Sequence, residues 1–422
     1  VSPTTGLVQK NNLTNVILKK INQADQIMAP NLMELITNVP GVYSINTGSS
    51  ISKPVIRGLS GLKVVTFWNG LRIENQQWAN DHGLNFTDMG IKSVEIVKGP
   101  SSLLYGADAL GGVLYFTDED YLPPNSFNSS FESRFESNSM SSFNIARIKL
   151  ATEKIRFNLY AGYKSAAEYQ IPDGEFVKNS SYNRKSLKAS LGYNKNNWIL
   201  NLRYNYNSNE NGLPGHTHSL NPSPEEFLLE TQHRERILPL QLIEDHYLSI
   251  ENKLILSNQS VIKFNTGFTS NSITEFEEKV TIPGISMLLN NIPYNFSFTS
   301  YVNENITWIS GVQGMLTKNS NDKAAESSLI PNASSYDLGS YSLLQYSKSK
   351  FETQIGLRYD IREIDAGDLL SKNFSKLNGS FGLVFQKGLY TLRTNFSSGF
   401  RPPHLSEMLS YGVHHGTNRF EI

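Results

Sequence analysis

The stretch WILNLRYNYN, residues 198–207, alternates apolar and polar side chains. Trp198, Leu200 and Leu202 would lie on one face of an extended segment, and Asn201 on the other. A period of two is the signature of a β-strand whose two faces meet different surroundings. The segment is also about as long as the ~9–11 residues that a tilted strand needs to cross a bilayer. This stretch therefore predicts a strand of a membrane-spanning barrel.

The same alternation returns many times in the later part of the chain. Clear examples are KIRFNLYAGY (154–163), FETQIGLRYDIR (351–362) and LYTLRTNF (389–396). By the alternation rule we count roughly thirteen such segments after residue 125. A soluble sandwich or propeller also has alternating strands, but these segments are about twice the mean strand length of ~5–6 residues. The pattern favours the antiparallel transmembrane barrel, with outer-membrane lipid around it.

The connections between these segments fall into two classes. Short polar turns are expected at 194–197, 257–260, 302–305, 347–350 and 386–388. Much longer connections lie between them, at 208–243, 320–335 and 362–375. Outer-membrane barrels have short periplasmic turns on one rim and long extracellular loops on the other. The alternation of short and long connections therefore predicts the same architecture.

Composition excludes several classes of function. The chain has no cysteine, which removes disulfides, thiolate metal sites and cysteine nucleophiles. With 38 basic and 38 acidic residues, it has no net charge that would draw a nucleic acid. No nucleophile–base motif is visible, and GADALGG (106–112) lacks the Lys-Ser/Thr of a phosphate-binding loop. We therefore expect neither an enzyme nor a nucleic-acid-binding protein.

Two prolines in DYLPPNS (120–126) break both helices and strands, and the composition changes there. We expect two domains, at residues 1–121 and 122–422. In the first, apolar residues at helical spacing in NLMELITNVPGV (31–42) predict a helix that ends at a Pro-Gly pair. The dipeptide Asn69-Gly70 between apolar runs predicts a β-hairpin. The first domain is therefore expected to be a compact α+β unit.

Two runs in this domain carry a family resemblance: PVIRGLSGLKVVTFWNGLRI (54–73) and IKSVEIVKGPSSLLYGADALGGVLYF (91–116). The residues that carry it are Arg57, Gly58, Asn69, Gly70, Glu95, Lys98, Gly99, Pro100, Tyr105, Gly106, Gly111, Gly112 and Val113. Together they resemble the plug domain of the TonB-dependent outer-membrane receptors. The resemblance implies an α+β plug inside an all-β transmembrane antiparallel barrel of 22 strands, in the outer membrane of a Gram-negative bacterium. With roughly thirteen strands present, the barrel in this chain is expected to be truncated.

The resemblance also implies a partner and a mechanism. A TonB-type periplasmic energy-coupling protein would pull the plug and release a tightly bound nutrient; a surface lipoprotein is a further expected partner. The coupling segment, or TonB box, is not recognisable in residues 1–20. Arg57, Glu95 and Lys98 would lie between plug and barrel wall, where charges need partners, and would hold the plug rather than touch the nutrient.

Histidines point to the cargo. QQWANDHGLNF (76–86) would face the extracellular vestibule, and GVHHGTNRFE (412–421) resembles a loop of the zinc-uptake subgroup, with related versions in haem receptors. Zn²⁺ prefers imidazole and carboxylate ligands in a four-coordinate site. Asp81, His82 and either His414 or His415 supply three ligands. The fourth is left open between water and a loop carboxylate: Glu407, Glu225 or Glu226.

The remaining histidines divide into two groups. His216 and His218 form a His-x-His pair in a long loop and are expected to act as a secondary capture site. His233, His246 and His404 are expected to be ordinary solvated or turn residues. Haem and an iron–siderophore complex remain alternative cargoes, and a non-transporting binding or assembly component remains an alternative function.

Overall fold

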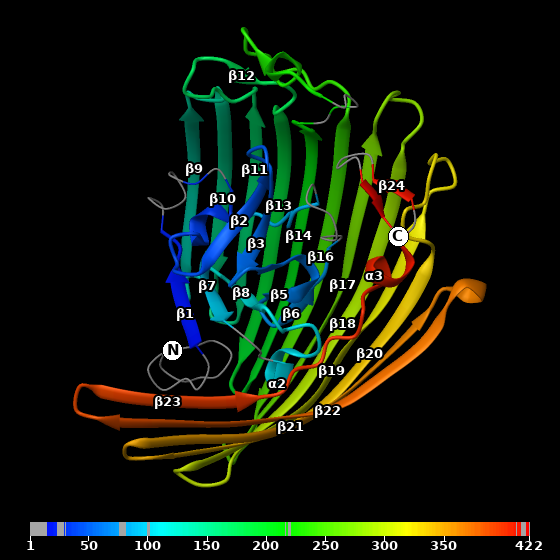
Figure 1. The fold of residues 1–422 in the computed structure, drawn as a ribbon. Helices are drawn as coiled ribbons and strands as arrows, with labels where there is room; N and C mark the ends of the chain where they lie inside the picture. The colour runs from blue at the N-terminus through cyan, green and yellow to red at the C-terminus, as the bar shows by residue number, and fades with distance from the viewer. Residues whose placement is uncertain are drawn as a thin grey trace.

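The chain forms a curved β-sheet wall and a small domain, the plug, on its concave side (Figure 1). The computed structural model describes residues 15–22, 29, 31–75, 82–98, 102–215, 217, 221–410, 412–414 and 419–421. The junction expected between residues 121 and 122 falls between the last plug strand, β8 (Gly112–Asp118), and the first wall strand, β9 (Ser126–Glu136).

The wall is one antiparallel sheet of 13 strands in the described residues, ordered as in the sequence from β9 to β23. After β9, its strands are β10 (Ser141–Ala151), β11 (Ile155–Ala166), β13 (Tyr182–Lys195), β14 (Trp198–Gly212), β16 (Leu240–Ile255), β17 (Val261–Phe276), β18 (Ile285–Tyr301), β19 (Ile306–Asn321), β20 (Ala333–Lys348), β21 (Phe351–Asp365), β22 (Ser371–Lys387) and β23 (Tyr390–Ser397). The 22 strands that the resemblance implies stay a prediction.

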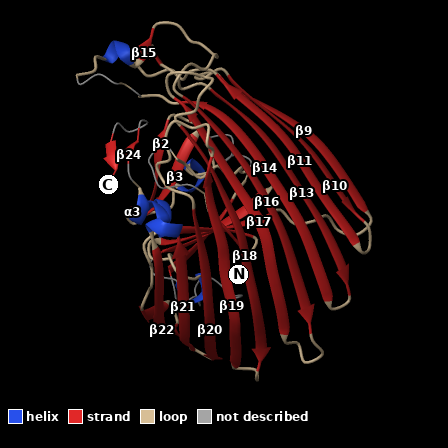
Figure 2. Ribbon diagram, turned by 90° about the vertical axis from the view of Figure 1, so that its right-hand side faces the viewer, coloured by secondary structure: helices blue, strands red, loops and turns tan. Residues whose placement is uncertain are grey.

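The wall has a short-turn rim and a long-loop rim. Two residues join β13 to β14, where Lys195 pairs with Trp198. Secondary structure also occurs in the long connections and after β23 (Figure 2). These elements are β12 (Phe176–Val177), η4 (Pro224–Glu226), β15 (Leu228–Leu229), η5 (Gly367–Leu369), α3 (Leu405–Leu409), β24 (Gly412–His414) and β25 (Arg419–Glu421). The long connections predicted after β14 and β19 are confirmed, but the one predicted at 362–375 is wrong: it is only residues 366–370, because β21 and β22 extend into it. Strands such as the 17-residue β18 are likewise longer than expected.

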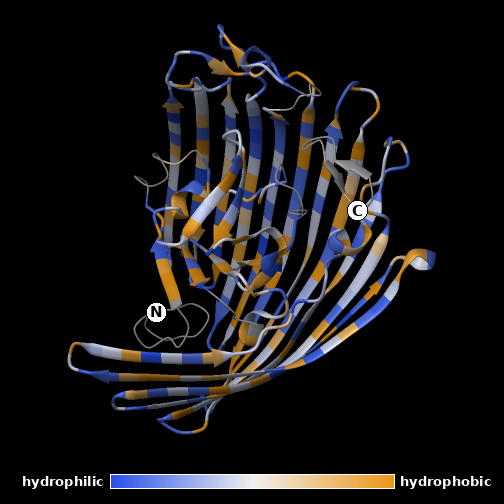
Figure 3. Ribbon diagram, in the orientation of Figure 1, coloured by the Kyte–Doolittle hydropathy of each residue, from blue (hydrophilic) through white to orange (hydrophobic). Residues whose placement is uncertain are grey.

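The two faces of the wall differ in polarity, as Figure 3 shows by the banding along its strands. On β14, Leu202 is 40% exposed whereas Arg203 is 9% exposed and Asn205 fully buried. Leu248 and Phe268 on neighbouring strands are likewise exposed on the outer face. This arrangement confirms the predicted alternation: apolar side chains point outward, where a bilayer would solvate them, and polar ones point toward the plug.

The plug contains a five-stranded sheet in the order β1-β7-β8-β5-β6 and a three-stranded sheet β2-β3-β4. Its elements before β8 are β1 (Asn15–Lys20), η2 (Glu34–Ile36), β2 (Val42–Thr47), β3 (Ile51–Ile56), β4 (Leu59–Ser60), η3 (Gly61–Lys63), β5 (Val64–Trp68), β6 (Leu71–Ile73), β7 (Ile91–Lys98) and α2 (Ser102–Tyr105). The predicted hairpin is confirmed: β5 pairs with β6, and both Asn69 (φ 48°) and Gly70 (φ 90°) have the positive φ that such a turn requires.

The helix predicted over residues 31–42 is wrong. Only Glu34–Ile36 form a single 3-10 turn. The Asn31 side chain accepts hydrogen bonds from the backbone N–H groups of Met33 and Glu34, both at 3.0 Å, and Pro40 prevents a longer helix. One turn is enough to bury Leu35 and Ile36, which explains the misleading spacing.

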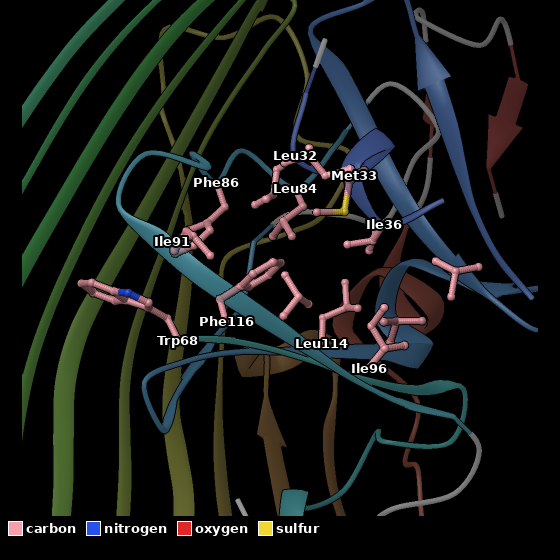
Figure 4. Packing of buried hydrophobic residues seen from close by; sticks show 14 of the residues in the cluster. Leu32, Met33, Ile36, Trp68, Leu84, Phe86, Ile91, Ile96, Leu114 and Phe116 are labelled. Atoms are coloured by element: carbon pink, nitrogen blue, oxygen red, sulfur yellow. The ribbon is translucent and has the colours of Figure 1, made fainter. Parts of the chain in front are cut away.

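The plug has its own apolar core (Figure 4). Trp68, Phe86, Leu114 and Phe116 pack together there, and Tyr247 is the one wall residue in the buried cluster that the structure describes. No helix of the described residues is both long and apolar enough to cross a membrane.

Candidate functional site

The His82 side chain of the plug lies against the inner face of the wall, toward the long-loop rim. Its Nε2 atom lies 3.0 Å from Oε1 of Glu275, near the end of β17. The same oxygen accepts a 2.8 Å hydrogen bond from Nε2 of Gln241, at the start of β16. His82 is 1% exposed and Glu275 2% exposed. The plug therefore delivers an imidazole to a buried carboxylate of the wall.

A close backbone approach fixes the segment that carries His82. A Cβ atom on Gly83 would lie only 2.7 Å from the carbonyl oxygen of Ser52 in β3. The N–H of Leu84 donates to that same oxygen at 2.9 Å. Only glycine allows the two segments to pack this closely.

Further polar contacts join the plug to β16 and β17. Asn85 Nδ2 donates to Oδ2 of Asp245 at 2.5 Å, and Asn271 Nδ2 donates to the other oxygen at 2.6 Å. Asn75 Nδ2 donates to the hydroxyl of Tyr247 at 2.9 Å. Asp245 and Tyr247 are both fully buried. The contact between plug and wall here consists mainly of hydrogen bonds.

A second group of contacts, which we call the ionic cluster, joins the plug to β20, β21 and the segment after β23. Its members are Arg72, Glu74, Asp108, Asp337, Arg362 and His404. Within the plug, Arg72 Nη2 lies 2.8 Å from both Glu74 Oε2 and Asp108 Oδ2. The β5–β6 hairpin is thereby bound to the loop after α2.

The wall completes the ionic cluster from the other side. Arg362 Nη2 lies 2.7 Å from Asp108 Oδ2 and 2.9 Å from Asp337 Oδ2. His404 Nε2 lies 3.2 Å from Glu74 Oε1. Two guanidinium groups thus face three carboxylates, and His404 is placed where a positive charge would balance them.

The plug carboxylates of the ionic cluster are held in their charged form. Burial alone would raise the pKa of Glu74, but the Arg72 guanidinium and the hydrogen bond with His404 outweigh it and lower the pKa from 4.5 to about 2. Burial opposes ionisation of Asp108 as well, and Arg362 and Arg72 hold the pKa of that carboxyl far below its usual range. Both groups therefore remain anionic at neutral pH.

Several predicted site residues lie outside the described residues: Asp81, His415, His216 and His218. His414 ends β24, where it pairs with Arg419 of β25. Figure 1 places β24 and α3 on the concave side of the wall. Of the predicted ligands, His82, Glu407, Glu225 and Glu226 have described side chains; Glu226 accepts a 2.7 Å hydrogen bond from the Thr217 hydroxyl.

Glu407 is already engaged in local contacts. Its carboxylate accepts a 2.6 Å hydrogen bond from Arg401 Nη2 and a 2.9 Å bond from the backbone N–H of His404, which caps α3. Burial would raise the pKa of Glu407, but these two contacts hold it below its usual value. A metal ion would have to displace both donors.

In the part of the chain that the structure describes, no group of three or more His, Asp or Glu side chains could hold a metal ion. The four-ligand zinc site predicted from the sequence therefore stays a prediction. What the structure brings together instead is His82 and Glu275, an imidazole–carboxylate pair that the sequence analysis did not anticipate.

The three residues expected to hold the plug lie as follows. Arg57 is exposed and has a positive φ of 51°. Lys98 donates to the carbonyl oxygen of Pro40, and Tyr105 donates to Glu95 at 3.4 Å. Both contacts join plug residues to each other. Lys98 was expected to lie between plug and wall, but its described contact is within the plug.

The residues that sequence reasoning missed are those of the ionic cluster. His404 does begin the α3 turn, as expected, but it also reaches Glu74. A visible signal was present in LRYDIR (357–362), where Arg358 and Arg362 share the inward face of a strand. The plug partner of Arg362, Asp108, lies 254 residues away and could not be found by spacing.

Comparison with known proteins identifies the family. Residues 11–113 match the model of the TonB-dependent receptor plug domain, and residues 100–421 match that of the TonB-dependent receptor-like β-barrel. The chain belongs to the TonB-dependent receptors. Membership in this family places it in the outer membrane of a Gram-negative bacterium, and the family consists of receptors rather than enzymes.

Individual relatives are more distant and longer. The chain is 24% identical over 444 residues to the heme/hemopexin utilization protein C of Haemophilus influenzae (strain 86-028NP), covering 92% of this chain and 61% of that protein. It is 28% identical over 180 residues to the vitamin B12 transporter BtuB of Vibrio vulnificus (strain CMCP6), covering 42% of this chain and 29% of that protein. The chain therefore spans less than two thirds of the length of these relatives.

Solved structures share the fold. The FrpB iron transporter from Neisseria meningitidis (F3-3 variant) superposes with a TM-score of 0.79 at 14% identity, covering 96% of this chain and 66% of that one. At this identity the likeness shows the arrangement of plug and wall and says nothing about the cargo.

Proposed function

We propose that this TonB-dependent receptor takes up a scarce nutrient across the outer membrane, driven by a TonB-type periplasmic partner. The observation that carries the proposal is the position of the plug, which lies on the polar, concave face of the wall and is bound to it by hydrogen bonds and ion pairs. A nutrient could pass only if the plug moved or rearranged. Such movement requires energy from outside the receptor.

Our proposed cargo is a metal-centred macrocycle, with haem as the first candidate. The relatives are named for heme/hemopexin utilization and for vitamin B12 transport, and haem and vitamin B12 both hold a metal inside a tetrapyrrole-derived ring. Histidine from a receptor is a common axial ligand of haem iron. His82 on the plug, with His414 or His415 after the last wall strand, would supply such ligands.

The surroundings of His82 support a role in metal recognition. Metal-binding histidines usually hydrogen-bond a carboxylate, a backbone carbonyl or water, which orients the ring and raises its basicity. Glu275 provides that partner at 3.0 Å. Because the His82 side chain is buried, its ring must turn toward the cargo when the cargo binds.

Bare Zn²⁺ is the second candidate. The observation that favours it is the same imidazole–carboxylate pair, His82 and Glu275, since these are the ligand types that zinc takes when no thiolate is present. Asp81, the adjacent residue in the sequence, would add a third donor. The names of the relatives favour the macrocycle over the ion.

One pair of titrations separates the candidates. Purified receptor is titrated with haem by absorbance and with Zn²⁺ by calorimetry, as wild type, His82→Ala and His233→Ala. We expect His82→Ala to weaken haem binding at least about tenfold, the loss of one metal–ligand contact of about 1.4 kcal/mol or more. His233, an exposed loop residue whose side chain hydrogen-bonds Thr231 and whose backbone bonds Glu168, is the matched control.

Each result has a distinct meaning. Zinc binding that depends on His82, without any haem binding, would replace the first candidate by the second. Cargo binding that is unchanged in His82→Ala would remove His82 from the site. Uptake by cells, measured with and without the inner-membrane proton gradient, separates active transport from binding alone: accumulation that persists without the gradient would refute a TonB-driven receptor.

A further inference from the structure

A polar cavity of about 580 Å³ lies between the plug and strands β11 to β17. Its lining includes Tyr193 and Asn194, beside the short β13–β14 turn, and Lys253 and Lys263, on the strands joined by the β16–β17 turn. The cavity is therefore at the rim that faces the periplasm in outer-membrane barrels. Its volume is within the ~300–1,000 Å³ typical of small-molecule sites.

The acidic residues of the cavity are already paired with cations. Three of them lie at the end of the last plug strand or directly after it. Asp118 pairs with Lys188, Glu119 with Lys149, and Asp120 with Lys92. The fourth, on β16, is Glu251, whose Oε2 lies 2.8 Å from Arg203 Nη2. Each of these four carboxylates thus already has a cationic partner, although Oδ2 of Asp118 is buried without a hydrogen-bond partner in the described structure.

The cavity lining has more basic side chains than these four ion pairs use. Lys253 and Lys263 stand directly opposite each other on β16 and β17, and Arg156 lines the cavity from β11. Among the described residues, none of the three forms an ion pair. Like charges directly opposite each other in a sheet are destabilising, so this arrangement would gain free energy from an anion placed between them.

Arg203 supplies a second, independent indication. It is 9% exposed, and its Nη1 atom is buried with no hydrogen-bond partner in the described structure, although Nη2 binds Glu251. A buried, charged donor without a partner is costly. An acceptor oxygen of a ligand in the cavity would remove this cost.

We propose that this cavity is a cationic exit site, which binds the carboxylate or phosphate groups of an anionic cargo as it passes along the β13–β17 side of the plug into the periplasm. Haem carries two such carboxylates. The inference rests on the proposed uptake function for its cargo, but the anion site itself can be tested without any cargo.

The cargo-independent test uses thiol chemistry, because the chain contains no cysteine. Ser190→Cys places a single thiol in the cavity lining. Its reaction rates with an anionic and a cationic methanethiosulfonate reagent are compared in the solubilised receptor. An excess of positive charge around a cavity raises the local concentration of anions by about tenfold or more, so we expect Lys253→Gln with Lys263→Gln to lower the anionic-to-cationic rate ratio about tenfold.

A matched pair controls for the loss of charge. Lys348→Gln with Lys350→Gln removes two exposed cations at the short β20–β21 turn, away from the cavity lining, and should leave the ratio unchanged. Arg156→Gln, on a different strand, should lower the ratio in the same direction as the lysine pair. A ratio that is unaffected by both the lysine pair and Arg156→Gln would overturn the anion site, whatever the cargo is.

Uptake then tests the exit role. With Lys253→Gln and Lys263→Gln we expect haem to bind from outside with wild-type affinity. The rate of haem uptake should fall about tenfold, the same factor as the fall in the reagent rate ratio, because both depend on the attraction of anions to the cavity. A lowered reagent ratio together with wild-type haem uptake would overturn the exit role. If the wild type binds no haem, the proposed cargo fails, and the reagent ratio still decides whether the cavity is an anion site.

Discussion

Arg362→Gln should loosen the plug from the wall. Arg362 contacts Asp108 through Nη1 at 3.1 Å and Nη2 at 2.7 Å, and it contacts Asp337 through Nη2 at 2.9 Å. Without it, three carboxylates of the ionic cluster, the buried Asp108 and the half-buried Glu74 and Asp337, would face the single guanidinium of Arg72. Removal of one partner from a buried ion pair costs about 3–5 kcal/mol, because the remaining charge is uncompensated.

The assay is hydrogen–deuterium exchange of the receptor, which reports the free energy of local opening. A loss of about 3 kcal/mol corresponds to an opening constant that is larger by about a hundredfold. The faster exchange should appear in plug peptides that contain β6 (Leu71–Ile73) and Asp108. Glu363→Gln, which removes an exposed charge from the next position of β21, is the matched control.

A double variant sharpens the test. Asp337→Asn added to Arg362→Gln removes one of the uncompensated carboxylates, so part of the lost protection should return. This coupling is expected because both side chains belong to one hydrogen-bonded network. Plug peptides that exchange at the wild-type rate in Arg362→Gln would refute the reasoning that the ionic cluster holds the plug.

Three further outcomes are expected. The pKa of Glu74 is lowered from 4.5 to about 2, so its ionised form contributes roughly 3 kcal/mol to stability above about pH 4.5. This contribution is lost as the pH falls toward 2, and calorimetric melting of the receptor across this range measures the loss. A melting transition of the plug that does not depend on pH would contradict the prediction. Gly83→Ala should push its loop off the Ser52 carbonyl and cost about 1–3 kcal/mol, seen as lost amide protection at the following residue. Leu202→Arg on the outer face should cost about 2–4 kcal/mol and reduce the heat-resistant folded band on gels, whereas Val302→Arg in an exposed turn should not.

The wall could be predicted from the sequence because a two-residue period records directly which side of a strand is solvated by lipid. In WILNLRYNYN (198–207), each apolar side chain expected on one face is on the outer face or partly exposed, and Arg203 is on the inner one. The hairpin at Asn69 could be predicted for a similar reason, since its turn chemistry is local. The helix at 31–42 failed because three apolar residues at helical spacing need only one 3-10 turn to be buried.

The candidate site could be predicted only in part. QQWANDHGLNF (76–86) pointed to His82, and the structure places that residue between plug and wall. Its partner Glu275 lies 193 residues further along the chain, and neither composition nor spacing connects the two. The same limit hid the contact between Arg362 and Asp108, which depends on how far the plug reaches into the curved sheet.

The plug has two kinds of stabilising contact, and the difference bears on how it could move. Its interior is an apolar core to which the described wall contributes one residue, Tyr247, whereas its boundary with the wall combines hydrogen bonds and ion pairs with a small apolar cluster of Met89, Ile145 and Tyr160. Burial of apolar area is lost in full when such a core opens, but polar groups exchange their partners for water, so each neutral hydrogen bond contributes only about 0.5–1.5 kcal/mol net. Withdrawal of the plug hydrates both sides of each ion pair together, unlike a mutation that leaves one charge buried alone. A receptor built this way can release its plug from the wall at a smaller cost in free energy than it would need to unfold the plug itself.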